Sequence, residues 1–380
     1  MRRRAFVGTA SATAAVAAAG FPNIVLGKGE PIRLGVIPPL TGGNALNGEE
    51  GHDGAEFAVR TINARAGKVY DDRPFELVVE DATSDNQTAV AAMNKLLTEN
   101  VDAIALPVLS TQIQAMEPLV KPTGTPWLTG GTNVKNTLLG CESLFRFRAS
   151  DGLTAAGLVN FAVGELKKSK IAIMTSSEVF GVGGGDQCEL ALKKLNMQAV
   201  SRQSWPVGAK DFTPEMLKIK QAGADAVIVY VQNPSDSALI FAALYQNDLK
   251  IPLIGSPGLG DANAIATAGP NANGNYAAID YIPSAATQAF SVAFEQVYHR
   301  KPEVGSGEGW VYSAVLFLAD VYRKIGTTDK GKTVAAIHAT KDYHAMMGTY
   351  TCDADGNMLH ELGIAQIENG AVKLVKTVKG

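Results

Sequence analysis

The chain has 380 residues, of which 46% are hydrophobic and 19% charged, and its formal net charge is -3 at pH 7. This length and composition are typical of a soluble globular protein with two domains and exclude the disordered and fibrous classes. The basic residues are scattered along the chain, which argues against a nucleic-acid or anionic-membrane surface and leaves small solutes as the natural partners.

The first 28 residues have the features of an export signal. Arg2, Arg3 and Arg4 precede Phe6 and a weakly apolar run of small residues from 7 to 20. A basic start followed by a short apolar stretch is typical of a signal peptide, and the consecutive arginines favour the twin-arginine route. We therefore expect residues 1–28 to be removed and the mature protein to be periplasmic. The alternative is a disordered or helical tail of a cytosolic protein.

From residue 29 the chain alternates short apolar strands with amphipathic helices. The first unit reads as a strand at 32–37, a loop rich in Gly and Asn at 41–48, and then a helix. Alternation with short loops predicts parallel strands joined by right-handed crossovers. Further strands are expected at 75–81, 102–108, 126–129 and 145–148, and helices at 88–99 and 112–121.

A second series of the same kind begins at residue 170. Thr213 and Pro214 mark the start of one of its helices, as N-cap and first helical residue. The sequence Glu368-Asn369-Gly370 predicts the turn of an antiparallel hairpin at 364–378. The other strands are expected at 171–177, 198–205, 225–231, 252–255 and 276–281, and the other helices at 186–195, 288–299, 310–325 and 333–339.

The two series predict an α/β fold of two Rossmann-like lobes, each a parallel sheet flanked by helices. Because the chain ends in helices followed by strands, we expect it to cross between the lobes more than once, through a hinge. The predicted boundaries place residues 29–150 and 281–346 in lobe 1, and residues 151–280 and 347–380 in lobe 2.

Two glycine-rich stretches resemble nucleotide-binding loops but lack the context that such loops need. Residues 326–333 match the P-loop pattern, yet the preceding apolar residues have helical spacing, which indicates a connection between two helices. Residues 181–186 follow a strand, but Asp186 replaces the third glycine of a dinucleotide motif and would repel a pyrophosphate. We expect the second stretch to be a flexible loop at the mouth of a cleft.

Candidate catalytic residues are not grouped in any known pattern. The five histidines include no HExxH, no serine lies in GxSxG, and the three cysteines include no CxxC. We therefore expect a protein that is not an enzyme and that uses no cofactor and no metal; a P-loop enzyme is the remaining alternative. One disulfide among the cysteines would suit an oxidising compartment, but the sequence does not decide the pair among Cys141, Cys188 and Cys352.

Four loops at the carboxyl ends of predicted strands are the candidate binding segments: 41–48, 109–112, 129–133 and 176–180. Ligands of open parallel sheets bind beyond these strand ends. The hydroxyls of Ser110, Thr111 and Thr132, beside amides at helix N-termini, suit a small carboxylate or carbonyl. The same side chains are also typical N-caps, so both roles stay open.

Several of these segments together resemble the periplasmic solute-binding proteins of the branched-chain amino-acid (Leu/Ile/Val-binding) type. The resemblance implies the type I periplasmic binding fold, whose two lobes close on a small ligand and deliver it to the permease of an ABC importer, with ATP used by a separate subunit. It also implies a monomer. A ligand-sensing receptor or regulatory domain of the same fold is the alternative. The resemblance is carried by IRLGVIPPLTG, FELVVEDATSD, VFGVGG, KDFTPEMLKIKQAGADAVIV, IPLIGS and WVYSAVLFLADVYRKIG.

The resemblance implies a set of ligand-binding positions in both lobes. Asn47 stands where the family often has an aromatic residue, and Pro257 stands where amino-acid binders place the acid that holds the ligand's ammonium group. Phe180 occupies the position of a usual tyrosine. The remaining positions are the carboxylate turn Leu109, Ser110 and Thr111, the next strand end at Gly130 and Thr132, and the strand end of the second lobe at Gln232.

Pro257 in place of an acid suggests a ligand other than a standard α-amino acid, such as an aromatic or aliphatic carboxylate or an amide. In a closed cleft, an ammonium without a carboxylate partner would lose a hydrogen bond worth about 1.5–3 kcal/mol and would also be desolvated. Asp280 or Glu308, which lie in segments expected to border the cleft, could supply the missing charge.

Overall fold

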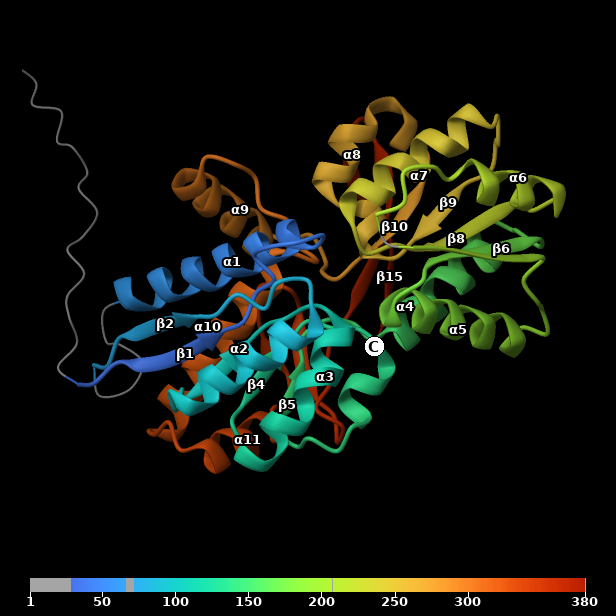
Figure 1. Cartoon of the computed structure of the whole chain (residues 1–380). Helices are drawn as coiled ribbons and strands as arrows, with labels where there is room; N and C mark the ends of the chain where they lie inside the picture. Colours follow the sequence, from blue (N-terminus) through green and yellow to red (C-terminus); the bar gives the residue numbers. More distant parts are fainter. Residues whose placement is uncertain (1–28, 66–71, 207, 380) are drawn as a thin grey trace, which may run out of the picture.

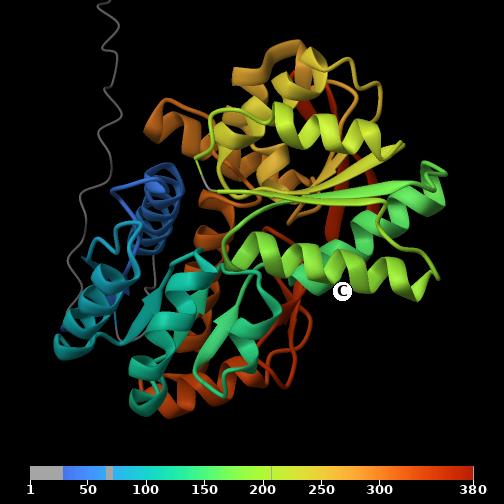
Figure 2. The same cartoon turned by 45° about the vertical axis from the view of Figure 1, so that its right-hand side comes forward.

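The computed structural model describes residues 29–65, 72–206 and 208–379, so the predicted export signal lies outside the described residues. The chain forms two α/β bodies with a five-stranded and a seven-stranded sheet (Figure 1). We call the five-stranded sheet with its helices lobe 1 and the seven-stranded sheet with its helices lobe 2. Figure 2 shows lobe 2, green to gold, above lobe 1, blue to teal. The predicted α/β fold with two Rossmann-like lobes is confirmed.

Lobe 1 is built on a parallel sheet in the order β2-β1-β3-β4-β5. Its strands are short and almost wholly apolar, as expected where helices cover both faces of a sheet. The strands are β1 (Ile32–Val36), β2 (Phe75–Val79), β3 (Ala103–Ala105), β4 (Trp127–Thr129) and β5 (Leu144–Arg146), and the helices are α1 (Ala45–Ala64), α2 (Asn86–Thr98), α3 (Ser110–Val120), α9 (Ala285–Tyr298), α10 (Glu308–Ile325) and α11 (Lys330–His338).

Lobe 2 is built on a sheet in the order β15-β14-β10-β9-β8-β6-β7. Strands β10, β9, β8, β6 and β7 are parallel, whereas β14 and β15 form the predicted antiparallel hairpin at the edge. The strands are β6 (Ile171–Ser176), β7 (Ser201–Trp205), β8 (Ala226–Tyr230), β9 (Leu253–Gly255), β10 (Tyr276–Ile279), β14 (Leu362–Glu368) and β15 (Ala371–Val378), and the helices are α4 (Asp151–Asn160), α5 (Val179–Lys194), α6 (Thr213–Gln221), α7 (Pro234–Gln246) and α8 (Ala262–Ala268).

The chain passes between the lobes three times, between β5 and α4, between β10 and α9, and before β14. A small sheet of β11 (Tyr343–His344), β12 (Thr349–Cys352) and β13 (Met358–Leu359) precedes the third passage. Met347, Tyr350 and Met358 are buried in the core of lobe 1. The chain therefore leaves lobe 1 close to residue 360, later than the predicted boundary at 347.

Helix α10 anchors lobe 1 because apolar side chains surround most of its length. Trp310, Phe317 and Tyr322 are among the largest fully buried side chains of the protein. Helix α1 packs against α10 with Gly54, where an added Cβ would lie 2.5 Å from the backbone oxygen of Glu308. Only glycine lets the two helices approach this closely. No helix among the described residues is both long and apolar enough to cross a membrane.

The glycine-rich stretch 181–185 is not a flexible loop, and that prediction is wrong. It forms the first turns of α5, which begins at Val179. The glycines serve close packing, since an added Cβ would lie 2.2 Å from the carbonyl oxygen of Ser176 at Gly181 and 2.0 Å from the ring of Tyr230 at Gly184. Helix propensity predicts a loop here, but packing against the sheet overrides it.

Three further expectations have definite outcomes. The P-loop-like residues 326–333 join α10 to α11, as predicted, with Gly326 in the left-handed conformation and Asp329 capping α11. A disulfide among the cysteines is not formed, because all three thiols are free and buried: Cys141, Cys188 and Cys352. Helix α1 also begins three residues after Gly42, so Asn47 lies in its first turn rather than in a loop.

Candidate functional site

The main candidate site is a pocket at which the carboxyl ends of the strands of both lobes meet. The cavity volume is about 30 Å³, which is room for one or two waters, so a solute needs the lips to part. The pocket is lined by Asn47, Val108, Thr132, Arg148 and Ser306 from the lobe 1 side, and by Phe180, Val231, Gln232, Pro234, Pro257, Gly258 and Asp261 from lobe 2.

Part of the predicted site lines this pocket. The predicted residues found there come from both lobes and are Asn47, Thr132, Phe180, Gln232 and Pro257. Their contact with a solute stays a prediction. The structure does not bring Leu109, Ser110, Thr111, Gly130, Asp280 or Glu308 into the lining.

The predicted carboxylate turn is occupied by contacts within lobe 1. The hydroxyl of Ser110 is buried and accepts hydrogen bonds from the backbone N–H of Asn133 at 3.3 Å and from the Asn136 side chain at 3.2 Å. Gly130 lies against the ring of Trp310, where an added Cβ would come within 2.5 Å. Leu109 is buried. These positions shape the loops behind the pocket.

The two acids expected to supply a missing charge are both paired with arginines. Asp280 is fully buried, and its Oδ2 accepts a hydrogen bond from Nε of Arg148 at 2.6 Å. Glu308 is also fully buried, and its Oε1 accepts from Arg300. The proposal that either acid faces a ligand ammonium is not supported by these contacts.

Two charged residues of the pocket were missed by sequence reasoning. Arg148 follows β5 at the first passage between the lobes, and Asp261 comes four residues after Pro257, just before α8. Oδ1 of Asp261 accepts the backbone N–H groups of Asn263 and Ala264, so it caps α8. Arg148 lies two residues after the end of β5, and that position was the available signal for it.

Hydrogen bonds across the pocket join the lobes directly. Nε2 of Gln232 in lobe 2 donates to Oδ1 of Asn44 in lobe 1 at 2.8 Å. The side-chain amide of Asn133 in lobe 1 donates to the carbonyl oxygen of Val179 at 2.9 Å. These contacts hold the two lips together.

Several acidic side chains, those of Asp261, Glu303 and Glu50, lie along the boundary of the lobes from the pocket outward. Oε2 of Glu303 accepts the N–H of Ala262 at 3.3 Å, which joins the loop before α10 to the start of α8. Burial, with the nearby carboxylate of Asp261 next in importance, raises the pKa of Glu303 to about 8. Burial and the neighbouring Glu308 raise the pKa of Glu50 to about 10. The carboxyl groups of Glu303 and Glu50 therefore bind protons more readily than exposed carboxylates do.

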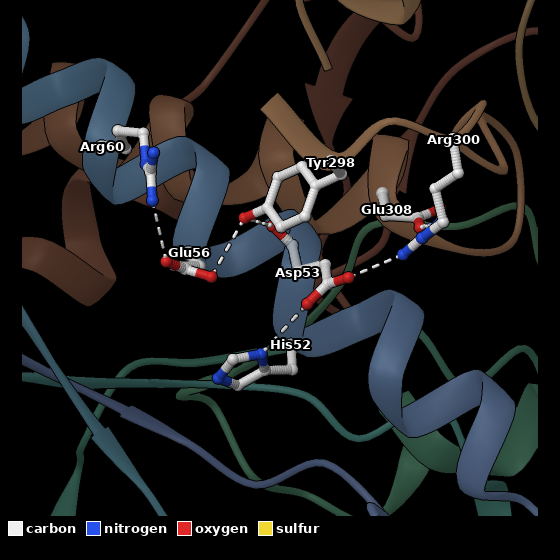
Figure 3. Close-up of polar contacts among 7 residues, drawn as sticks. All are labelled: His52, Asp53, Glu56, Arg60, Tyr298, Arg300 and Glu308. Carbon is white, nitrogen blue, oxygen red and sulfur yellow. Dashed lines mark hydrogen bonds and ion pairs between the residues drawn. The ribbon is translucent and has the colours of Figure 1, made fainter. Parts of the chain in front are cut away.

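A separate cluster on α1 contains potential metal ligands, but its acids are already bound. Among the described residues, one atom each of His52, Asp53 and Glu56 lie within 4.8 Å of one another. Asp53 binds Arg300 at 2.6 Å, and Glu56 accepts from the hydroxyl of Tyr298 at 3.0 Å (Figure 3). The cluster thereby ties α1 to the end of α9 and to the segment that follows it.

The fold and pocket define a two-lobed α/β binding protein. Residues 31–371 match the family described as periplasmic binding protein, and the chain belongs to that family. It is a solute-binding protein, and its family implies a periplasmic location. Members of the family are binding proteins rather than enzymes, and the match favours solute binding over the sensing role that the sequence left open.

Similar proteins bind small solutes of two kinds. The "Leu/Ile/Val-binding protein homolog 3" of Brucella melitensis is 26% identical over 86% of this chain and 88% of its own length. The branched-chain amino acid transporter substrate-binding protein LivJ of Streptococcus pneumoniae, in complex with isoleucine, is 22% identical with a TM-score of 0.83, covering 92% of this chain and 100% of its own. An ABC transporter solute-binding protein of R. palustris in complex with benzoate is 20% identical with a TM-score of 0.82, covering 92% and 96%. The type I periplasmic binding fold is thus confirmed.

Proposed function

We propose that this protein is the substrate-binding component of an ABC importer that captures a small organic solute and delivers it to a membrane permease. The observation that supports this best is a pocket lined from both lobes at the carboxyl ends of their strands. A solute that contacts both lobes stabilises the closed form, and the permease would recognise that form. ATP would be hydrolysed by a separate subunit, and the binding protein itself would act as a monomer without a cofactor or catalytic step.

The hinge in this proposal is the set of three passages between the lobes. We place residues 29–150 and 281–360 in lobe 1, and residues 151–280 and 361–380 in lobe 2. We move the third boundary from the sequence-based one because Met347, Tyr350 and Met358 are buried in the core of lobe 1. Hinge motion needs few residues to change conformation, and short connections at element ends satisfy this requirement.

The ligand in this proposal is amino-acid-like or an aromatic or aliphatic carboxylate or amide, and we favour one that is not a standard α-amino acid. Pro257 lines the pocket without a charge. Asp261 is the nearest acid of lobe 2 along the chain, but burial raises its pKa and two backbone amides occupy one of its oxygens. A carboxyl group in this state is a poor partner for an ammonium ion. Similar proteins form complexes with both kinds of ligand: one binds isoleucine, an α-amino acid, and another binds benzoate, an aromatic carboxylate.

A thermal-shift screen followed by isothermal titration calorimetry tests the proposal. Leucine, benzoate derivatives and short amides are added to the purified protein, because a ligand that binds the native state raises its melting temperature by mass action. We expect at least one carboxylate or amide to bind and leucine to bind weakly. Tight leucine binding would overturn the ligand class, and no response to a broad metabolite library would overturn the transport function.

Export by the twin-arginine route is a separate part of the proposal. It rests on Arg3, Arg4 and Phe6, which lie outside the described residues. A fusion of residues 1–28 to a reporter, expressed in cells with and without a working twin-arginine pathway, tests it. Export that continues without that pathway would contradict this route.

A further inference from the structure

Arg148 stands out because it is largely buried, lines the pocket and uses little of its hydrogen-bonding capacity. Its side chain is 10% exposed. Nε donates to Asp280 at 2.6 Å, and Nη1 donates to the carbonyl oxygen of Gly130 at 3.4 Å. Among the described residues, Nη2 has no hydrogen-bond partner. An arginine presents five donors in a planar fork, so most of the fork remains available.

The ion pair with Asp280 alone does not account for this geometry. Arg300, whose pairs are structural, binds Asp53 and Glu308 with its terminal nitrogens (Figure 3). Arg148 instead binds Asp280 through Nε alone, and Oδ1 of Asp280 is buried without any partner. Asp280 therefore holds the guanidinium from one edge and leaves the terminal nitrogens for another acceptor.

Three acids lie around Arg148, and among the described residues none of them accepts a hydrogen bond from its terminal nitrogens. Asp280 forms a largely buried ion pair with Nε, Asp151 is a second acid close by, and Asp261 lines the same pocket. Burial raises the pKa of Asp151 to about 7, so this acid carries only part of a negative charge at neutral pH. Pairs of terminal guanidinium N–H groups match the two oxygens of a carboxylate better than any neutral acceptor.

We propose that Arg148 binds the carboxylate group of the transported solute, and that Asp280 is a positioning residue that fixes the guanidinium in the pocket. This inference rests on the proposed function and deepens it, because it restricts the solute to anions and excludes neutral amides as preferred ligands. Arg148 and Asp280 lie on two of the passages between the lobes, and Nε2 of His360 on the third lies 3.2 Å from the carbonyl oxygen of Asp280. The carboxylate is thus bound at the hinge.

Acid and amide pairs of equal shape test the proposal. The probes are benzoate with benzamide and 4-methylpentanoate with 4-methylpentanamide, measured by calorimetry on the wild-type protein. We expect the better acid to bind about ten- to a hundredfold more tightly than its amide, the range for hydrogen bonds to a charged group. Equal affinity of acid and amide would overturn the assignment of Arg148 while leaving the proposed function standing. No binding of any solute in a broad library would overturn both.

Substitutions test whether Arg148 causes the preference for acids over amides. Arg148→Met should abolish the acid preference, so that acid and amide bind with equal affinity. Arg202→Met removes the same charge from an ion pair outside the pocket and should leave the acid preference of the wild type intact. Arg148→Met leaves Asp280 buried without a partner. If this variant does not fold, the double variant Arg148→Met/Asp280→Asn, which removes both charges, is measured in its place. A retained tenfold acid preference in either variant would overturn the proposal.

Discussion

The hydrogen bond between Gln232 and Asn44 allows a direct test of closure as the source of affinity. Nε2 of Gln232 donates to Oδ1 of Asn44 at 2.8 Å across the two lobes. Asn44 is the N-cap residue of α1, yet its side chain caps no amide of that helix. The substitution Asn44→Ala therefore removes a contact of the closed form without removing a helix cap. Asn44 also lies outside the pocket lining, so the substitution leaves the solute's contacts unchanged.

The expected effect follows from the strength of one neutral hydrogen bond. Such a bond contributes about 0.5–1.5 kcal/mol, and this one is only partly buried. Loss of that free energy from the closed form weakens the apparent affinity by about two- to twelvefold. The intrinsic contacts of the solute do not change, so the loss arises from the opening of the lobes.

Calorimetry with whichever solute binds the wild-type protein measures this effect. Thr41→Ala is the matched control, because the Thr41 hydroxyl binds Asp81 within lobe 1 at 2.9 Å and does not reach lobe 2. We expect the control to bind as the wild type does. The double variant Asn44→Ala/Gln232→Ala completes a thermodynamic cycle.

The cycle separates two roles of Gln232. If Gln232 acts only through Asn44, the double variant and each single variant bind equally weakly. If Gln232 also contacts the solute, Gln232→Ala costs more than Asn44→Ala. An affinity of Asn44→Ala within experimental error of the wild type would refute the reasoning that this bond stabilises the closed form.

Three other predictions concern pH, packing and thiols. Burial raises the pKa of Glu303 from 4.5 to about 8, so its contribution to the stability of the closed form is complete below pH 4.5 and is lost as the pH rises through about 8. The melting temperature should therefore fall over that range, and Glu303→Gln should flatten the fall. An unchanged slope in the variant would contradict the raised pKa of Glu303. Gly54→Ala should lower the free energy of unfolding, measured in urea, by about 1–3 kcal/mol, because the added Cβ would contact the α10 backbone. The control Gly164→Ala should have little effect, because its added Cβ meets nothing within 4 Å. Equal stabilities of the two variants would show that α1 and α10 can separate freely. Thiol titration should detect three free thiols in denaturant and slow reaction in the native protein, and a lower total would indicate a disulfide.

Much of the fold could be predicted from local patterns. The alternation of short apolar strands with amphipathic helices predicted two parallel sheets. A short apolar run indicates a buried strand, and apolar residues at helical spacing indicate a helix that covers it. Glu368-Asn369-Gly370 specified the hairpin of β14 and β15, which the structure confirms. Thr213 and Pro214 located the start of α6 to within one residue, although the N-cap is Phe212 rather than the predicted Thr213 and no side chain caps this helix. These features depend on neighbours in the sequence and need no knowledge of distant residues.

The errors arose where distant packing decides the local structure. The stretch 181–185 has the composition of a loop, yet it is helical, and its glycines are needed because Tyr230 and Ser176 lie too close for a larger side chain. Ser110 has the chemistry of a carboxylate ligand, yet its hydroxyl is used by Asn133 and Asn136. Propensity and residue type cannot reveal such partners, because the partners are brought together only by the fold.

The sequence by itself determined the class of the protein, the two sheets and the strand ends at which a binding pocket would form. The tertiary structure alone decided which charges face that pocket. Glu308 and Asp280 are each neutralised by an arginine, whereas Arg148 and Asp261 line the cavity. The physical reason is that a buried charge takes its role from the partners within a few ångströms, and these partners can lie far apart in the sequence, as Arg148 and Asp280 do on separate passages between the lobes.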